Sequence, residues 1–314
     1  MDGIRGPHLG GSDVYSRRDD RESEALSRLI AGSRHDGAMA PKPRSLILDL
    51  FGEYLRFADA QVRLGHLTTL LGDFDVSAAT VRVTMSRLRR EDWFTSEREG
   101  RETIYRLSDE MLGVLREGRT RIFAEPTRSW DGGWTMVIYQ LSEGERQERE
   151  QLRKQLAWHG FGSLTTSTWL APGDRRSVAR ELVGHLQQDR ADVVRCTTDG
   201  PEQDHDFTKR CWDLDELASD YQVFLAEHDE LQGRAPKLTG ADALVARTVL
   251  ISHYRHFPFR DPQLPPELLP KGWPGDAAYK LFRTAHAELG PAARKYVGEV
   301  IGRPVDDPET SPLP

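Results

Sequence analysis

Arginines recur on one side of the segment from Ser77 to Glu91, SAATVRVTMSRLRRE. At 3.6 residues per turn, Val81, Met85 and Leu88 share one face, which predicts an amphipathic helix that buries this stripe. Ser77 is suited to cap its start, because a serine hydroxyl accepts an unpaired backbone N–H. The opposite face carries Arg82, Val83, Ser86, Arg87 and Arg90. Guanidinium groups pair with phosphates and guanine edges, so we predict a DNA-recognition helix, although such a face alone is more often solvated surface.

The patterns on either side favour DNA recognition. Residues 45–71 read as helix, short extended piece and second short helix. Two alternating runs follow the arginine-rich segment and surround Glu99–Arg101, which is a hairpin signal, with Ile104 expected inward and Tyr105 outward. This order of elements is that of a winged helix-turn-helix. The further predicted DNA contacts are Arg44 on the first helix and Arg98, Arg101 and Thr103 on the hairpin.

Composition places the chain among globular proteins. It has 314 residues, of which 38% are hydrophobic and 30% charged, and no apolar run is long enough to cross a bilayer. A net charge of −7 is compatible with DNA binding when the basic groups face one way. Cys196 and Cys211 form no metal-binding pattern, and no secretory signal is visible. We therefore expect free thiols, a cytoplasmic protein and no membrane partner.

Two further regions follow the predicted winged helix. Between residues 134 and 197 the patterns read β-α-β-β-α-β, which predicts a ferredoxin-like domain. After a connector at 204–212, long helical patterns surround a proline-rich stretch at 260–274, and a break before Pro291 separates the last two helices. The expected fold class is α+β with a helical C-terminal domain. The predicted boundaries are 1–40 for a disordered tail, 41–125 for the winged helix DNA-binding domain, 130–200 for the ferredoxin-like domain, 205–302 for a helical ligand and dimer domain and 303–314 for a second disordered tail.

Several stretches carry a resemblance to a known family. They are PRSLILDLFGEYLR ending at Arg56, WDGGW at Trp130–Trp134, and RDPQLPPELLPKGWPG ending at Gly275. On these, the chain resembles the PaaX family of bacterial repressors of phenylacetate catabolism, over nearly everything from Pro41 to about Val297. The GFGSLTTSTW hairpin departs from the family in its turn residues. The resemblance implies a homodimeric repressor released from operator DNA by a CoA thioester such as phenylacetyl-CoA, with no other cofactor.

A two-fold dimer would read an imperfect palindrome in double-stranded DNA. For the CoA thioester, a cluster of cations and rings beside the proline-rich stretch is the predicted site, because phosphates and an aromatic acyl group would suit it. Its residues are His253, Tyr254, Arg255, His256, Arg260 and Trp273. The competing interpretation is that the rings pack in the core and the arginines pair with acidic side chains.

Two other classes of function compete with a repressor. Ferredoxin-like domains related to CRISPR-associated nucleases place an aspartate at the end of the first strand to hold a metal. Here that strand ends in Tyr139-Gln140-Leu141, and His253 with His256 lacks a third ligand. We therefore expect no catalytic residue and no metal. The other alternative is a protein-binding winged helix, which weak, salt-insensitive DNA binding would favour.

Overall fold

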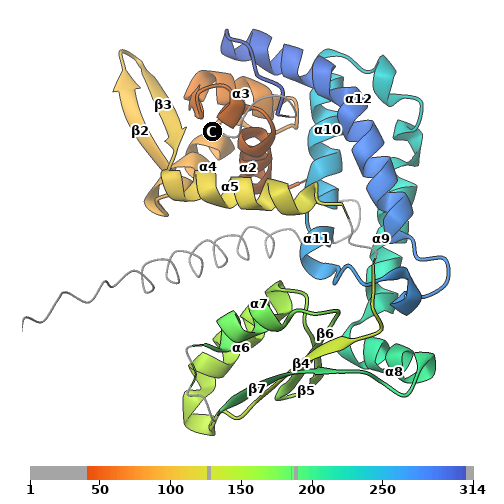
Figure 1. The fold of residues 1–314 in the computed structure, drawn as a ribbon. Coiled ribbons are helices and arrows are strands. Elements are labelled where there is room, and N and C mark those ends of the chain that lie inside the picture. The colour runs from red at the N-terminus through yellow and green to blue at the C-terminus, as the bar shows by residue number, and fades with distance from the viewer. Residues whose placement is uncertain (1–40, 126–128, 185, 187–189, 309–314) are drawn as a thin grey trace, which may run out of the picture. The chain divides into compact units, whose positions relative to one another are not determined.

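The computed structural model describes residues 41–125, 129–184, 186 and 190–308 (Figure 1). Helices and two antiparallel sheets make up this part of the chain, which confirms the α+β class. Within the described residues, no helix is long and apolar enough to cross a membrane. The tail predicted at 1–40 lies outside the described residues.

The described chain divides into two compact units that do not follow the order of the sequence. Unit 1 comprises the described residues within Met1–Phe123, Glu230–Tyr254 and Phe282–Pro314. Unit 2 comprises those within Ala124–Asp229 and Arg255–Leu281. The second half of the chain therefore contributes to both units.

The amino-terminal part of unit 1 contains the predicted helices and hairpin. In chain order it has α2 (Pro43–Glu53), the 3-10 turn η1 (Leu55–Phe57), β1 (Gln61–Arg63), α3 (Leu64–Gly72), α4 (Ala78–Arg90), β2 (Phe94–Glu99) and β3 (Glu102–Leu107). The strands pair antiparallel in the order β1-β3-β2. Figure 1 shows the β2–β3 hairpin extending from the group of α2, α3 and α4.

Apolar stripes hold these elements together. Each helix buries the face that its sequence predicts, for example Leu50 on α2, Leu70 on α3 and Met85 on α4, all fully buried. The hairpin corrects one expectation, because Tyr105 is buried and Ile104 is only half-buried. Tyr105 shares a strand face with the buried Leu107, since side chains alternate along a strand.

Three further α-helices contribute to the described part of unit 1, which also contains the 3-10 turn η4 (Ala235–Lys237). α5 (Asp109–Ile122) begins at Ser108, whose Oγ accepts the Met111 N–H at 3.3 Å. α10 (Gly240–Tyr254) packs on α2, and the part of α12 (Gly275–Ile301) from Phe282 onward belongs to the same unit. The predicted break before Pro291 is wrong, because α12 continues through it. The residues around this proline, such as Leu289 and Ala293, are fully buried, and that packing offsets the missing N–H.

Part of the tail predicted for residues 303–314 is described. The Arg303 guanidinium pairs with Asp59 at 2.9 Å, and Asp307 pairs with Arg294 at 2.6 Å. The backbone N–H of Asp306 donates to the carbonyl of Phe57 at 3.2 Å. Residues 303–308 are therefore anchored to unit 1, whereas 309–314 lie outside the described residues.

Unit 2 is built on the second sheet. Its elements are β4 (Trp134–Tyr139), the 3-10 turn η2 (Glu143–Glu145), α6 (Arg146–Trp158), β5 (Gly162–Thr165), β6 (Thr168–Pro172), α7 (Arg176–Val183) and β7 (Ala191–Cys196). The strands pair antiparallel in the order β5-β6-β4-β7. α6 and α7 cover one face of this sheet through a core that includes Leu152, Leu156 and Ala179 (Figure 1).

The predicted connector at 204–212 is wrong, because α8 (Pro201–Cys211) is a helix there. Pro201 occupies its first turn, where a proline needs no N–H partner. Asp204 on α8 accepts a hydrogen bond from the Trp134 indole at 2.8 Å, and both side chains are buried. Unit 2 also contains α9 (Leu214–His228), α11 (Phe257–Arg260) and the 3-10 turn η5 (Pro266–Leu268).

Candidate nucleic-acid interface

The predicted recognition helix is α4. It begins after Ser77, whose Oγ accepts the Thr80 N–H at 3.2 Å, which confirms the predicted cap. Val81, Met85 and Leu88 are fully buried, and α4 packs through this side on α2 and α3. The apolar stripe therefore fixes which side of α4 faces solvent.

The solvent side of α4 is cationic. Arg82, Arg87 and Arg90 are exposed, and the sequence of α4 contains no carboxylate. Within the residues that the structure describes, Arg82 and Arg87 form no ion pair, and Arg90 Nε donates only a long hydrogen bond of 3.4 Å to the Ser86 carbonyl. Val83 lies among them with 52% of its surface exposed. This face can pair with phosphates and guanine edges, while Val83 offers a methyl-sized apolar contact of the kind thymine accepts.

The β2–β3 hairpin carries the other predicted contacts. Arg98 lies opposite Thr103 in the strand register, and Arg101 follows Gly100 at the tip. Gly100 has φ of 62°, a left-handed conformation that glycine adopts without strain and that closes this tight turn. Both arginines are exposed, and Thr103 is half-buried.

An additional arginine, which the sequence did not single out, lies on the strand beside the hairpin. Arg63 on β1 pairs with Glu99 at 2.6 Å and also with Glu102. These glutamates flank the tip of the hairpin, so Arg63 reduces the negative charge beside Arg98 and Arg101. Only the pairing of β1 with β3 reveals this role, because Arg63 and Glu102 are 39 positions apart in the sequence.

Arg44 at the start of α2 differs from the other predicted DNA contacts. Its guanidinium donates a hydrogen bond of 2.9 Å to Glu91, forms an ion pair with the same carboxylate at 2.6 Å, and lies 4.1 Å from the centre of the Trp93 ring. The pair is partly exposed, with 38% and 42% of the two side chains accessible. Its DNA contact stays a prediction, as do those of the residues on α4 and the hairpin.

Unit 1 also contains a buried ionic cluster that joins α2, α5, α10 and α12. Glu53 at the end of α2 accepts a hydrogen bond from Arg119 of α5 at 3.2 Å, forms an ion pair with Arg247 of α10 at 3.1 Å, and is 2.7 Å from His286 Nε2 of α12. Burial alone would raise the pKa of the Glu53 carboxyl, but His286, Arg247 and Arg119 together hold it well below its usual range. Burial lowers the pKa of His286 to about 4, with the charge of Arg247 as a second cause. We call Glu53, Arg119, Arg247 and His286 the Glu53 cluster.

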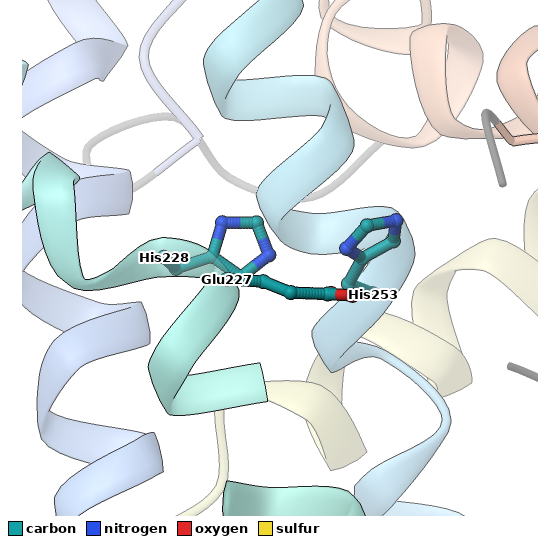
Figure 2. A group of neighbouring side chains, drawn as sticks. All are labelled: Glu227, His228 and His253. Atoms are coloured by element: carbon teal, nitrogen blue, oxygen red, sulfur yellow. The ribbon is translucent and has the colours of Figure 1, made fainter. Parts of the chain in front are cut away.

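The residues predicted for the effector fall in both units. His253 lies on the last turn of α10 in unit 1, and Glu227 and His228 are neighbours on the last turn of α9 in unit 2 (Figure 2). In unit 1, Tyr254 stacks on Phe282 with ring centres 4.0 Å apart. These contacts agree with the interpretation of Tyr254 as a packing residue.

The remaining effector residues belong to unit 2. Arg255 and His256 are buried, and Arg260 pairs with Asp220. Trp273 lies edge-on to Tyr221, with ring centres 5.8 Å apart. The acidic partner of Arg260 is the one that the competing interpretation requires, and the effector role of the six residues stays a prediction.

The two cysteines are poor candidates for nucleophilic chemistry. Cys196 and Cys211 are free thiols, as expected, and burial raises the pKa of Cys211 to about 12. A thiol is a poor nucleophile while it keeps its proton.

Known proteins resemble this chain along most of its length. Family models match three consecutive segments: PaaX-like protein at residues 42–111, PaaX protein central Cas2-like domain at 127–208, and PaaX-like protein C-terminal domain at 212–299. Transcriptional repressor PaaX of Escherichia coli (strain K12) is 31% identical over 286 residues, which cover 87% of this chain and 89% of that protein.

A solved structure is similar as well. Uncharacterized protein Rv0674 from Mycobacterium tuberculosis aligns with a TM-score of 0.51 and 24% identity. The alignment covers 75% of this chain and 89% of the other. At this identity the likeness concerns the fold alone.

Proposed function

Because the chain belongs to the PaaX family, we propose that it is a DNA-binding transcriptional repressor that reads its operator with α4 and the β2–β3 hairpin. One observation carries this proposal. α4 exposes four arginines, Arg82, Arg87, Arg89 and Arg90, and no carboxylate, while Val81, Met85 and Leu88 on its other face are fully buried. The name of the Escherichia coli relative, a transcriptional repressor, agrees with this use of the helix.

The amino-terminal part of unit 1 is then a winged helix-turn-helix. Three helices, an antiparallel sheet in the order β1-β3-β2 and a projecting hairpin support that assignment. In such a domain α4 enters the major groove, where Arg82 and Arg87 reach base edges or phosphates. Arg98 and Arg101 at the hairpin then contact phosphates or the minor groove. A homodimer would place two copies of α4 on an imperfect palindrome.

We assign the sheet of unit 2 to a ferredoxin-like domain without enzymatic activity. The strand order β5-β6-β4-β7, with α6 and α7 on one face, supports the fold. The end of β4 reads Tyr139-Gln140-Leu141 and provides no carboxylate for a metal. A nuclease assay with magnesium or manganese tests this part of the proposal, and cleavage of DNA would contradict it.

Regulation follows from the family in this proposal. A CoA thioester such as phenylacetyl-CoA would bind the DNA-incompetent state more tightly than the competent one and so release the operator of an aromatic, phenylacetate-type catabolic operon in the cytoplasm. Mobility shifts with and without phenylacetyl-CoA test this. Equal operator affinity with and without phenylacetyl-CoA would exclude this compound as the effector.

The DNA interface is tested by salt dependence. Each phosphate that a cation neutralises contributes about −0.9 to the slope of log Kobs against log salt. We expect a steep slope for the wild type and a shallower one for a variant carrying Arg82→Ala and Arg87→Ala. Arg234→Ala is the matched control, because its side chain is 62% exposed and lies in unit 1 but outside the reading elements.

The competing function, a winged helix that binds another protein, predicts a different result. Weak DNA binding with little salt dependence, unchanged by the α4 substitutions, would favour it and contradict the repressor. Binding that is steeply salt-dependent in the wild type and the Arg234→Ala control, but not in the α4 variant, would support the repressor.

A further inference from the structure

Unit 2 contains a cavity that none of the proposed DNA contacts uses. It has a volume of about 980 Å³ and lies at the end of β4. Its walls come from the segment that follows β4, from α6, from the turn between β5 and β6, and from Arg190 just before β7. Small-molecule sites typically measure about 300–1,000 Å³, so this hollow is large enough for a ligand of nucleotide size.

Two arginines on α6 line the cavity. Arg149 and Arg153 are four residues apart, so they share one face of the helix, and both are partly buried. Among the residues that the structure describes, neither forms an ion pair or a hydrogen bond. Like charges at this spacing repel each other, so the pair is best satisfied by an anion that binds both.

Arg190 forms a fixed wall of the same cavity. Its guanidinium donates to Glu145 at 2.5 Å and to the Gln140 carbonyl at 3.3 Å. Glu145 also accepts from the backbone N–H and the hydroxyl of Ser142 at 2.9 and 2.6 Å, in a capping box at the start of η2. The hydrogen bonds from Arg190 and Ser142 lower the pKa of Glu145 to about 2, so this carboxylate stays charged and neutralises Arg190.

The remaining charge balance of the lining is therefore positive. Arg149 and Arg153 face one further acidic lining residue, Glu150, which is exposed. Ser167 adds a hydroxyl group that can donate to an anionic oxygen, whereas the Ser142 hydroxyl already donates to Glu145. Guanidinium forks with neighbouring hydroxyls match the geometry and charge of phosphate groups.

We propose that this cavity binds the phosphate groups of a nucleotide-sized small molecule, with Arg149 and Arg153 as the phosphate-binding pair and Arg190 as a fixed wall. The proposal does not depend on the DNA interface, since every residue involved lies in unit 2. A free ligand rather than a DNA strand is its occupant, because Arg149 and Arg153 are half-buried in the walls of the hollow, whereas cations that follow a duplex backbone are exposed, as Arg82 and Arg87 are.

Titration calorimetry on the full chain tests the pair. The probes are inorganic pyrophosphate, which carries the phosphate chemistry alone, and adenosine 3′,5′-bisphosphate, which adds a nucleoside. We expect Arg149→Ala and Arg153→Ala each to weaken binding of both probes by about tenfold or more, since each removes charge-assisted hydrogen bonds. Arg146→Ala is the matched control, because Arg146 is an exposed arginine on α6 outside the lining.

Further variants separate binding from folding. Arg149→Lys with Arg153→Lys keeps both charges, so it should bind pyrophosphate more tightly than the double alanine variant. Tighter binding of the bisphosphate than of pyrophosphate would support a nucleotide as the occupant, and equal binding would support the phosphate site alone.

Three results would overturn the proposal. The first is no binding of either probe to the wild type. The second is equal weakening by Arg146→Ala and by the lining variants. The third is a loss of affinity for nonspecific duplex DNA in the lining variants while pyrophosphate fails to compete, because the arginines would then belong to a DNA surface. None of these results bears on the α4 arginines, so the repressor proposal stands or falls separately.

Discussion

The arginines of unit 1 occupy two opposite environments. On α4, Arg82 and Arg87 are exposed and form no ion pair within the described part of the chain. In the Glu53 cluster, Arg247 has only 2% of its side chain exposed and is paired with a carboxylate. Taking a guanidinium out of water is costly unless an anion compensates it, so the chain supplies Glu53 where the arginine is buried. Where the chain supplies no anion, the charge remains available to a polyanion outside.

The two groups also differ in what they connect. The α4 row lies on one helix, whereas the Glu53 cluster joins α2, α5, α10 and α12. α2 belongs to the amino-terminal segment that carries the proposed reader, and α10 and α12 come from the second half of the chain. The cluster therefore fixes carboxyl-terminal helices to that segment, which explains how distant parts of the sequence form unit 1.

Removing the charge of Glu53 should have the largest effect. Glu53→Gln leaves Arg247 buried without a carboxylate, and breaking a buried pair costs about 3–5 kcal/mol of unfolding free energy. Urea denaturation followed by circular dichroism measures this. Glu91→Gln is the control, because its pair with Arg44 is exposed and should contribute about 1 kcal/mol or less. Equal losses in the two variants would remove the distinction between buried and exposed arginines.

Arg87→Ala tests the exposed arginines of α4. We expect operator affinity to fall by about 1–3 kcal/mol if Arg87 makes a two-pronged contact to a base. The unfolding free energy should change by less than about 0.5 kcal/mol, because the side chain is exposed and forms no ion pair with any residue that the structure describes. Fluorescence anisotropy with a labelled operator and urea denaturation measure the two quantities on one preparation. A variant that loses stability but keeps operator affinity would show that Arg87 stabilises the fold and does not contact DNA.

The sequence predicts the exposed arginines of α4 and the hairpin far better than the buried Glu53 cluster. Ser77, the stripe from Val81 to Leu88 and the hairpin around Gly100 are local patterns, because helix and strand periods are set by neighbouring residues. The Glu53 cluster joins residues up to 233 positions apart, so no local pattern reveals it. Its one visible signal is Arg247, a cation within the mostly apolar stretch ALVARTVLI of α10.

The errors of prediction have the same origin. Residues 204–212 are polar and read as a connector, but the bond from Trp134 to Asp204 and packing on the sheet stabilise α8. Pro291 reads as a helix end, yet buried contacts carry α12 through it. In both cases tertiary contacts outweigh a local preference. For the DNA and effector residues, spacing identifies the residue types, but contact with a ligand is not encoded in spacing.

Acid should lower the unfolding free energy through His286 of the Glu53 cluster. The pKa of His286 is lowered to about 4 in the folded chain, so the unfolded chain binds more protons between about pH 6.5 and 4. Stability is then full above about pH 6.5 and falls as pH decreases, with a slope of at most about 1.4 kcal/mol per pH unit from this one group. The depressed pKa of Glu53 acts in the same direction at lower pH.

Urea denaturation between pH 7.5 and 5 measures this slope, and His286→Gln is the matched variant because it removes the titrating group. We expect a flatter pH profile in the variant. Operator affinity per folded molecule should not follow the same titration, because α4 carries no histidine. An identical pH profile in the two proteins would exclude His286 as the acid-sensitive group.

The smallest expected effect concerns Arg44, whose environment shares features with both the exposed α4 arginines and the buried Glu53 cluster. It is paired with Glu91 and lies over Trp93, as a structural arginine would, yet it is 38% exposed and lies at the start of α2, beside the residue that ends α4. If it contacts a phosphate, Arg44→Ala lowers operator affinity less than Arg87→Ala does and reduces the salt slope by about 1. Glu91→Gln should then raise affinity by less than about 1 kcal/mol, because it removes a carboxylate that competes with phosphate for the same guanidinium. Anisotropy at several salt concentrations measures both variants. Unchanged affinity in both, with only a small loss of unfolding free energy, would place Arg44 with the structural arginines, and the reading surface would then consist of α4 and the hairpin alone.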